Sequence, residues 1–370
     1  MKRRPCISAV ILAAGTSSRM GTVKQLLRLG DCPLLEHVLD NVRSSSAAEI
    51  VLVLGFAAEA IQREIKLDNV RLIVNSQYRQ GMGTSLQSGL AAVDPAAEGA
   101  LVVLADQPLV RPGTLDRLIA EHQAGKAQIV IPTYRGFRGN PVLLDRSIFP
   151  ELMGLSGDIG CRAVFGDHID GIVKLPVDDV GILLDVDEPS DLEGLATRNG
   201  AWQETALLET TACGGQQVAA SADAQPELIV VGRDALAMAL ARLGRILRFT
   251  VTAVDPLLAT ADLPAADRVL HALDFSLLGK HRDRYVVVAS RGACDEEAIE
   301  QALDVKSTYV ALVANRKRGE EVLRALRAKA VPPEVLARVR VPAGLEIGAA
   351  TPEEIALAIM AEIIQERRKS

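Results

Sequence analysis

The chain has 370 residues and a formal net charge of −6, with 49% hydrophobic and only 3% aromatic residues. Its length predicts two domains or three, and its acidic balance argues against a general role on nucleic acid or on a membrane surface. Five scattered cysteines without a Cys-x-x-Cys pair are typical of a cytoplasmic protein that has no zinc site. The first apolar run, residues 7–12, is too short for a signal peptide core or a membrane span.

Strand-like and helix-like segments alternate through the first half of the chain. Strands are expected at residues 7–13, 50–54, 71–74, 100–105, 128–132 and 182–184. Helices are expected at residues 33–42, 57–65, 84–93 and 113–123. The third of these helices begins with a capping-box pattern, Thr84 to Gln87. Such alternation predicts a sheet of mostly parallel, buried strands covered by helices.

Residues 199–226 are small and polar, which indicates a linker between a domain at 1–198 and a domain at 227–370. Beyond the linker, strands are expected at 227–231, 249–254, 285–289 and 308–313, and helices at 234–247 and 351–366. Thr351 should cap the last helix, with Pro352 at its first position. We therefore predict the α/β class with two three-layer Rossmann-like domains. The first holds a nucleotidyltransferase-type, mostly parallel sheet and the second a smaller doubly wound sheet.

The loop after the first strand carries the clearest functional signal. Residues 13–24 read AAGTSSRMGTVK. Gly15 lets backbone N–H groups approach phosphate oxygens, Arg19 adds a planar two-pronged donor, and Lys24 adds a mobile charge. The loop lacks the Gly-Lys-Ser/Thr ending of an ATPase P-loop and the third glycine of a dinucleotide fingerprint. It therefore predicts a phosphate site of another kind, one that resembles the signature loop of nucleotidyltransferases.

Carboxylates follow two of the expected strands. Asp106 comes directly after residues 100–105, at the edge of a sheet where α/β proteins bind ligands, and oxygen ligands suit Mg²⁺. Asp185 and Asp187 end another expected strand and, being two apart, can share a face. A strand-end aspartate is also a common helix cap or turn former, so either of the latter two can instead cap the helix after Pro189.

Further motifs follow the loop in a fixed order. They are GMGTSL at 81–86, DQP at 106–108, RGNPV at 138–142 and DVDEPSDL at 185–192. Together with the loop, this set resembles the molybdenum-cofactor cytidylyltransferase family over residues 5–198. The resemblance implies Mg²⁺-dependent transfer of CMP from CTP, or alternatively GMP from GTP, to molybdenum-bound molybdopterin, with release of pyrophosphate. It also implies a role in the maturation of molybdenum hydroxylases.

The resemblance implies a role for individual residues as well. The implied catalytic residues are Arg19, Lys24 and Asp106. The implied nucleotide-binding residues are Ala13, Ala14, Gly15, Thr16, Arg19, Lys24, Ser85 and Asp106. The implied metal ligands are Asp106 and Asp187, and the implied acceptor-binding residues are Asn140 and Pro141, although residues 138–141 also read as an ordinary turn.

The second half contains a partial dinucleotide fingerprint. Gly232 stands where the first glycine belongs, and Asp255 ends the next expected strand, where an acid that binds ribose is expected. Arg233 and Leu236 replace small residues, which disfavours a close approach of the backbone to pyrophosphate. The pattern predicts a Rossmann-like unit without establishing a bound nucleotide.

The C-terminal segment 342–356, PAGLEIGAATPEEIA, and the segments 308–310 and 315–317 resemble the xanthine dehydrogenase accessory proteins. This second resemblance covers residues 227–368 and implies a partner in an apo molybdenum hydroxylase. Two other functions stay open: a nucleotidyltransferase for another phosphorylated metabolite, and a non-catalytic carrier or chaperone of the molybdenum cofactor.

Overall fold

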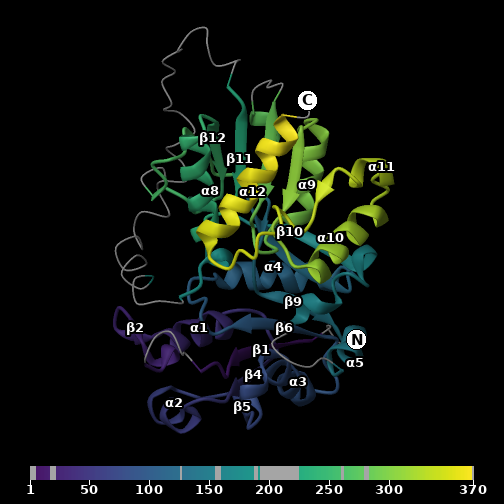
Figure 1. The fold of residues 1–370 in the computed structure, drawn as a ribbon. Coiled ribbons are helices and arrows are strands. Elements are labelled where there is room, and N and C mark those ends of the chain that lie inside the picture. The colour runs from purple at the N-terminus through teal and green to yellow at the C-terminus, as the bar shows by residue number, and fades with distance from the viewer. Residues whose placement is uncertain are drawn as a thin grey trace. The chain divides into compact units, whose positions relative to one another are not determined.

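The computed structural model describes residues 6–16, 22–125, 127–154, 160–186, 191, 225–259, 262–278 and 283–368. The chain forms two compact units, one of Met1–Tyr134 and Arg138–Gly215, the other of Gln216–Ser370 with the turn Arg135–Phe137 (Figure 1). Most of the expected linker at 199–226 lies outside the described residues, so the predicted domain boundaries stay a prediction.

The first unit is built on an eight-stranded sheet in the order β10-β7-β9-β6-β1-β4-β5, with β8 paired to β7. Its strands are β1 (Ile7–Ala13), β4 (Glu49–Leu54), β5 (Arg71–Val74), β6 (Gly99–Leu104), β7 (Ile129–Tyr134), β8 (Phe137–Arg138), β9 (Val142–Asp145) and β10 (Ile172–Pro176). β1, β4, β5 and β6 are parallel, whereas β9 runs antiparallel to β6 and β7. The carboxyl ends of β5, β4, β1 and β6 therefore share one edge. A small antiparallel pair, β2 (Arg28–Leu29) and β3 (Cys32–Pro33), lies apart from this sheet.

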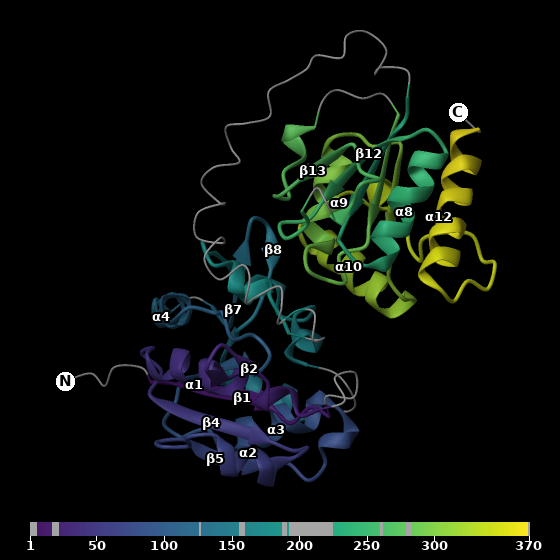
Figure 2. The same cartoon turned by 90° about the vertical axis from the view of Figure 1, so that its left-hand side faces the viewer.

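Helices cover both faces of this sheet (Figure 2). They are α1 (Leu34–Arg43), α2 (Ala58–Glu64), α3 (Met82–Ala92), α4 (Pro112–Gln123) and α5 (Phe149–Leu152), with 3-10 turns η1 (Lys24–Leu26), η2 (Tyr78–Gln80), η3 (Arg146–Ile148), η4 (Cys161–Val164), η5 (Ile169–Gly171) and η6 (Val180–Leu183). Ile11 of β1 packs in one core with side chains of α1, α2 and α4. Val10, on the opposite face, packs with Leu86 and Leu90 of α3. Burial on both faces explains why β1 is a continuous apolar run.

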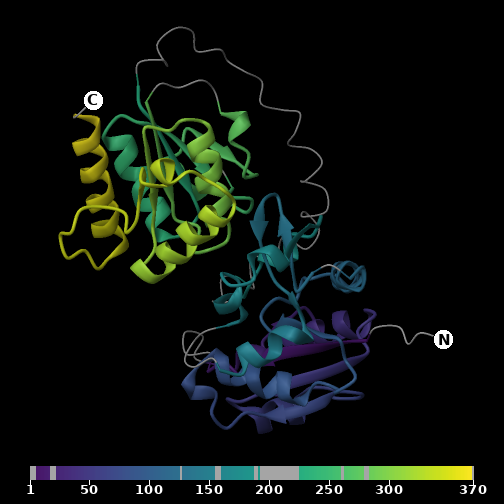
Figure 3. The same ribbon diagram turned by 90° about the vertical axis from the view of Figure 1, so that its right-hand side faces the viewer.

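The second unit has a six-stranded, all-parallel sheet in the order β13-β12-β11-β14-β15-β16. Its strands are β11 (Glu227–Val231), β12 (Thr250–Val254), β13 (Arg268–Leu270), β14 (Arg284–Val288), β15 (Tyr309–Leu312) and β16 (Val339–Arg340). Its helices are α8 (Ala235–Ile246), α9 (Asp295–Asp304), α10 (Arg316–Ala328), α11 (Pro333–Leu336) and α12 (Pro352–Arg367), with the 3-10 turn η9 (Phe275–Leu277). Numbered within the unit, this is the Rossmann order 3-2-1-4-5-6. α12 lies alongside α8 on one face (Figure 3) and α9 packs on β14 and β15.

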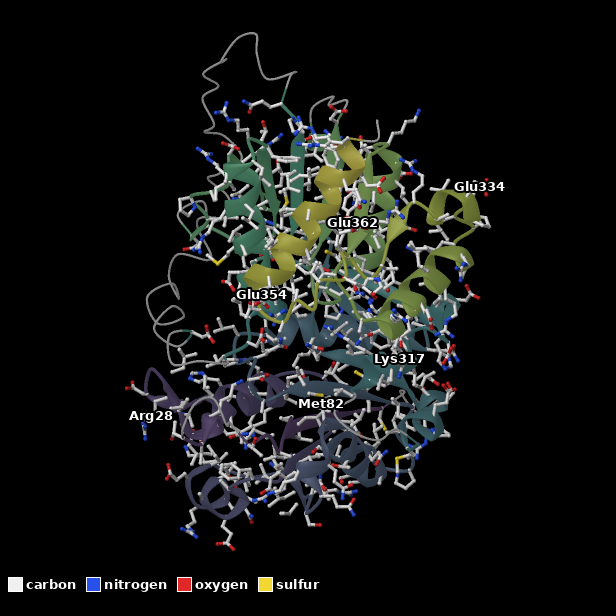
Figure 4. The ribbon with its side chains drawn as sticks, in the orientation of Figure 1. Arg28, Met82, Lys317, Glu334, Glu354 and Glu362 are labelled. Atoms are coloured by element: carbon white, nitrogen blue, oxygen red, sulfur yellow. The ribbon has the colours of Figure 1, made fainter. Side chains whose placement is uncertain are left out.

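The last helix is fixed at its start and along its length. Thr351 and Glu354 form a complete capping box, as the sequence predicted, and backbone N–H groups of Thr351 and Ala350 lower the pKa of Glu354. The Glu362 carboxylate accepts hydrogen bonds from the Tyr309 hydroxyl (2.6 Å) and the Gly344 N–H (2.8 Å). Both glutamates are labelled on α12 in Figure 4. These contacts tie the segment before α12 to the sheet.

The fold class is confirmed, and most expected elements agree with the observed ones to within two residues. The capping box at Thr84 is wrong, because α3 starts earlier, at Met82 after Gly81, with no side-chain cap. The expected strand at 182–184 is also wrong. This segment is the 3-10 turn η6, whose first N–H groups are organised by the Asp179 carboxylate accepting from the Gly181 N–H at 3.0 Å.

The short strands β13 and β16, with three and two residues, were not expected, because so few residues carry no periodic pattern. Among the described helices, none combines the length and apolar character needed to span a membrane.

Candidate functional site

The loop that leaves β1 presents an open backbone. The Ala13 carbonyl accepts a hydrogen bond from Gln25 Nε2 (3.0 Å), and the Ala14 carbonyl accepts one from the Phe56 N–H (3.3 Å). Gly15 and Thr16 are exposed, and a Cβ added at Gly15 would meet nothing within 4 Å. Neighbouring elements therefore hold the loop by its first two residues and leave space beside Gly15. Arg19 lies outside the described residues.

Lys24 and Asp106 meet at the carboxyl edge of the sheet. Lys24 Nζ lies 3.0 Å from Asp106 Oδ2, and the two side chains are 13% and 31% exposed. The pairing follows from the topology, because β1 and β6 are adjacent and parallel. Asp106 Oδ1 is buried and has no hydrogen-bond partner. The carboxylate therefore has one oxygen paired with a cation and a second, buried oxygen whose hydrogen-bonding capacity is unused.

The segment expected to supply a second carboxylate also reaches Asp106, but by another route than predicted. The Val186 N–H donates to the Asp106 backbone carbonyl at 2.9 Å, and Asp185, next to it, is exposed. Because η6 and irregular backbone precede Asp185 instead of a strand, the argument that Asp185 and Asp187 share a strand face is wrong. Asp187 lies outside the described residues.

Ser85 is buried in a polar cluster at the start of α3. Asn75, directly after β5, donates from Nδ2 to Ser85 Oγ (3.0 Å) and Thr84 Oγ1 (2.9 Å), and its Oδ1 accepts from the Gln77 N–H (2.9 Å). The exposed fractions of Asn75 and Ser85 are 5% and 4%. Sequence reasoning missed Asn75, although a lone polar residue at the carboxyl end of a strand was a usable signal.

The predicted acceptor-side residues are held through one backbone carbonyl. The Ile182 carbonyl accepts hydrogen bonds from the Asn140 N–H (3.1 Å) and, more weakly, from Gln107 Nε2 (3.4 Å). A Cβ at Gly139 would overlap the same oxygen, so the close approach requires glycine there. Asn140 is half-buried and Pro141 is buried. Gln107, which sequence reasoning left without a role, connects Asp106 to this turn.

The described residues can supply only some of the oxygen ligands that Mg²⁺ needs. Among the residues that the structure describes, no group of three or more His, Cys, Asp or Glu side chains could hold a metal ion. Mg²⁺ commonly keeps several waters and is held by one or two carboxylates together with substrate phosphates. The partnerless oxygen of Asp106 fits that mode of binding.

The loop after β11, which corresponds to the Gly15 loop of the first unit, has no open space beside its glycine. Gly232 has a φ of 131°, and a Cβ there would lie 2.5 Å from the Ala289 carbonyl oxygen. Asp234 caps α8 by accepting from the Ala237 N–H at 3.0 Å, and its second oxygen lies 2.8 Å from Arg291 Nε. The chain's own carboxylate therefore occupies the helix N-terminus where a phosphate would bind in a dinucleotide site.

Asp255 ends β12 as predicted for a ribose-binding acid but points into the protein. It is 7% exposed and accepts from the Leu257 N–H at 2.9 Å. Burial raises the pKa of this carboxyl, an effect that Arg233, the Leu257 N–H and His271 oppose. The residue is thus engaged within its own unit.

Comparisons with known proteins agree with both units. Residues 9–172 match the model of the MobA-like NTP transferase domain, and residues 228–363 match that of the XdhC Rossmann domain. The chain is 33% identical over 167 residues to "Nicotine blue oxidoreductase" of Paenarthrobacter nicotinovorans, covering 43% of this chain and 80% of that protein. It is 40% identical over 114 residues to "Bifunctional protein GlmU" of Paraburkholderia xenovorans, covering 30% of this chain but only 25% of that protein.

A solved structure also matches the first unit. The crystal structure of Rv0371c from Mycobacterium tuberculosis is 35% identical, covers 52% of this chain and 99% of that chain, and gives a TM-score of 0.48.

Proposed function

The chain belongs to the MobA-like NTP transferase family and carries an XdhC Rossmann domain, and from this premise we propose that its first unit is a Mg²⁺-dependent nucleotidyltransferase. The proposed reaction transfers CMP from CTP to molybdenum-loaded molybdopterin and releases pyrophosphate, with GTP as the alternative donor. The observation that carries the proposal is the Lys24–Asp106 pair beside the open Gly15 loop.

The proposed roles follow from position. The exposed backbone of Gly15 and Thr16, together with Arg19 and Lys24, binds the triphosphate, because N–H groups and cations attract phosphate oxygens. When the nucleotide binds, the Lys24 ammonium group moves from Asp106 to the phosphate oxygens. Asp106, with Asp187, would hold Mg²⁺, which when bound supplies charge neutralisation at the phosphates.

The acceptor side needs positioning more than acid–base chemistry. The acceptor is already a phosphate, so no strong general base is required, and most of the catalysis comes from alignment and electrostatics. Asn140 and Pro141 are proposed to bind the acceptor. Ser85 is proposed to contact the nucleotide from its place beside Asn75 at the start of α3.

The test is pyrophosphate release by the full chain with Mg²⁺ and molybdenum-loaded molybdopterin, with CTP, GTP, ATP and UTP compared side by side. Release with CTP alone, lost in Asp106→Ala, supports the proposal. If pyrophosphate is released only with another phosphorylated acceptor, that acceptor replaces molybdopterin as the proposed substrate. Nucleotide or cofactor binding without any release would favour the carrier function instead.

For the second unit we propose a role in delivering the product to an apo molybdenum hydroxylase in the cytoplasm. Its likeness to XdhC Rossmann domains supports this role, and joining both units in one chain raises the effective concentration of product at its carrier. The fused chain should load a target hydroxylase faster than the two separated units do. Equal loading by the unlinked units would contradict the delivery role.

A further inference from the structure

Two aromatic side chains of the first unit differ from all others that the structure describes. Every described phenylalanine and tyrosine is buried except Phe56 and Tyr78, which are half-buried. These two form a pair, with ring centroids 6.5 Å apart and planes tilted by 56°. In a chain with only 3% aromatic residues, two partly exposed rings in contact mark a surface on which a flat ligand can stack.

The pair lies directly against the loop that follows β1. The Phe56 N–H donates to the Ala14 carbonyl at 3.3 Å. A Cβ at Gly55 would lie 2.6 Å from Tyr78 Cβ and 2.9 Å from Ala14 Cβ, so the absence of a side chain at Gly55 lets Tyr78 approach Ala14. The backbone of the proposed triphosphate loop and the aromatic pair are therefore parts of one surface.

The end of Tyr78 is also fixed. Arg79 Nε donates to the Tyr78 hydroxyl at 3.3 Å, and the Arg79 guanidinium carbon lies 5.8 Å from the Tyr78 ring centroid. The turn η2 that carries Tyr78 is closed by a hydrogen bond from the Gly81 N–H to the Tyr78 carbonyl at 3.2 Å. A ring held in this way loses little conformational freedom when a ligand stacks on it.

Strand order gives the site a direction. Along the carboxyl edge the sheet runs β5-β4-β1-β6-β9. Phe56 and Tyr78 follow β4 and β5, the Gly15 loop follows β1, Asp106 follows β6, and Asn140 precedes β9. A nucleotide whose phosphates lie over β1 therefore has the aromatic pair on one side of those phosphates, after β4 and β5, and Asp106 and Asn140 on the other.

We propose that Phe56 and Tyr78 bind the nucleobase of the nucleoside triphosphate by stacking. This assignment rests on the proposed nucleotidyltransferase function and adds to it the place of the base. Stacking accepts any planar heteroaromatic ring, so the pair provides affinity and orientation for the base and does not by itself select cytosine over guanine.

The experiment compares two probes by calorimetry on the full chain with Mg²⁺: CTP, and inorganic tripolyphosphate, which has no ring. Tyr78→Leu keeps apolar bulk but removes the ring, and Tyr78→Phe keeps the ring but removes the hydroxyl. Val74→Ala, at an exposed apolar position on β5, is the matched control. Thermal unfolding of each variant verifies that it folds.

We expect Tyr78→Leu to raise the Kd for CTP about tenfold, the order expected for one stacked ring, and to leave the Kd for tripolyphosphate unchanged. Tyr78→Phe, which keeps the ring and loses only the hydroxyl contact with Arg79, should raise the Kd for CTP much less than Tyr78→Leu, and Val74→Ala should behave as the unaltered chain. Equal weakening of both probes, or an unchanged Kd for CTP, would overturn the assignment. A change confined to KM for molybdopterin would also overturn it, because the ring would then bind the acceptor.

The two proposals fail in different ways. If the unaltered chain binds no nucleoside triphosphate and releases no pyrophosphate, the nucleotidyltransferase function is contradicted. If the unaltered chain does both and Tyr78→Leu leaves CTP binding as it was, only the role of the aromatic pair is contradicted.

Discussion

The two units place an ion pair at opposite ends of their first strands. In the first unit, Lys24 and Asp106 meet at the carboxyl ends of β1 and β6, where both remain partly exposed. In the second, Glu227 and Arg284 pair at 2.7 Å across the amino ends of β11 and β14, with exposed fractions of 6% and 4%. A partly exposed pair can exchange partners with a ligand, whereas a fully buried pair lies out of reach of one.

The loops after the two first strands differ in the same way. Gly15 has open space around it, whereas Gly232 packs against Ala289 and the adjacent Asp234 caps α8 itself. Both loops read in the sequence as a strand, a glycine and a helix. This pattern therefore indicates a ligand site only where the chain leaves open space beside the glycine, as it does at Gly15 and not at Gly232.

The largest effect is expected when the buried Glu227–Arg284 pair of the second unit is broken. Glu227→Ala removes the carboxylate that binds the buried Arg284 guanidinium and should lower the free energy of unfolding by about 3–5 kcal/mol, measured by urea denaturation. Arg63→Ala, which removes an exposed Arg63–Glu59 pair, is the control and should change it by less than about 0.5 kcal/mol. A similar loss in both variants would show that burial does not distinguish the pairs.

The next largest effect concerns the partly exposed Lys24–Asp106 pair of the first unit. Asp106→Ala should lower the rate of pyrophosphate release by roughly 10²–10³-fold, as for other groups that stabilise charge in a transition state, without a matching loss of stability. Asp234→Ala, the strand-end loop carboxylate of the second unit, is the control and should leave the rate unchanged. If both variants lose activity alike, the functional contrast between the two loops is wrong.

A smaller effect tests whether Asp234 serves as a cap. Asp234→Ala removes the acceptor of the Ala237 N–H and should lower the free energy of unfolding by about 1 kcal/mol, as measured by urea denaturation. Thr351→Ala, which removes the cap of α12, should cost a similar amount. An Asp234→Ala variant as stable as the unaltered chain would mean that the carboxylate is not needed by the helix.

The smallest effect uses the pH dependence of Asp255. Because burial raises its pKa in the folded state, the ionised carboxyl destabilises the fold, and stability falls as pH rises from the unfolded pKa through the folded one. Asp255→Asn should therefore be more stable than the unaltered chain at pH 7, and this gain should shrink as the pH falls from the raised folded pKa to the usual carboxyl pKa. Unfolding curves at several pH values measure it, and a gain independent of pH would contradict the explanation.

Local patterns in the sequence predicted the elements that depend on local chemistry. β1, β5 and β11 have the expected bounds, because each is a short apolar run with clear ends. Thr351 caps α12 as expected, because a capping box involves only four consecutive residues. The fold class followed from the alternation of such elements, since parallel strands joined by helices form layered α/β domains.

Contacts between distant residues were decided by the tertiary structure. The Phe56–Tyr78 pair forms only when the turns after the neighbouring strands β4 and β5 converge. The same holds for η6, which Asp179 organises while also accepting from the Thr114 hydroxyl 65 residues away.

The strand and the glycine loop at the start of each sheet could be predicted from the sequence alone, because backbone conformation and apolar periodicity are local properties. The sequence did not determine which loop stays open. Asp234 pairs with Arg291, and Glu227 pairs with Arg284 in the interior; in each pair the partners are 57 residues apart in the sequence. The strength of such a pair depends on distance and on exclusion of water, and both arise only when the sheets assemble.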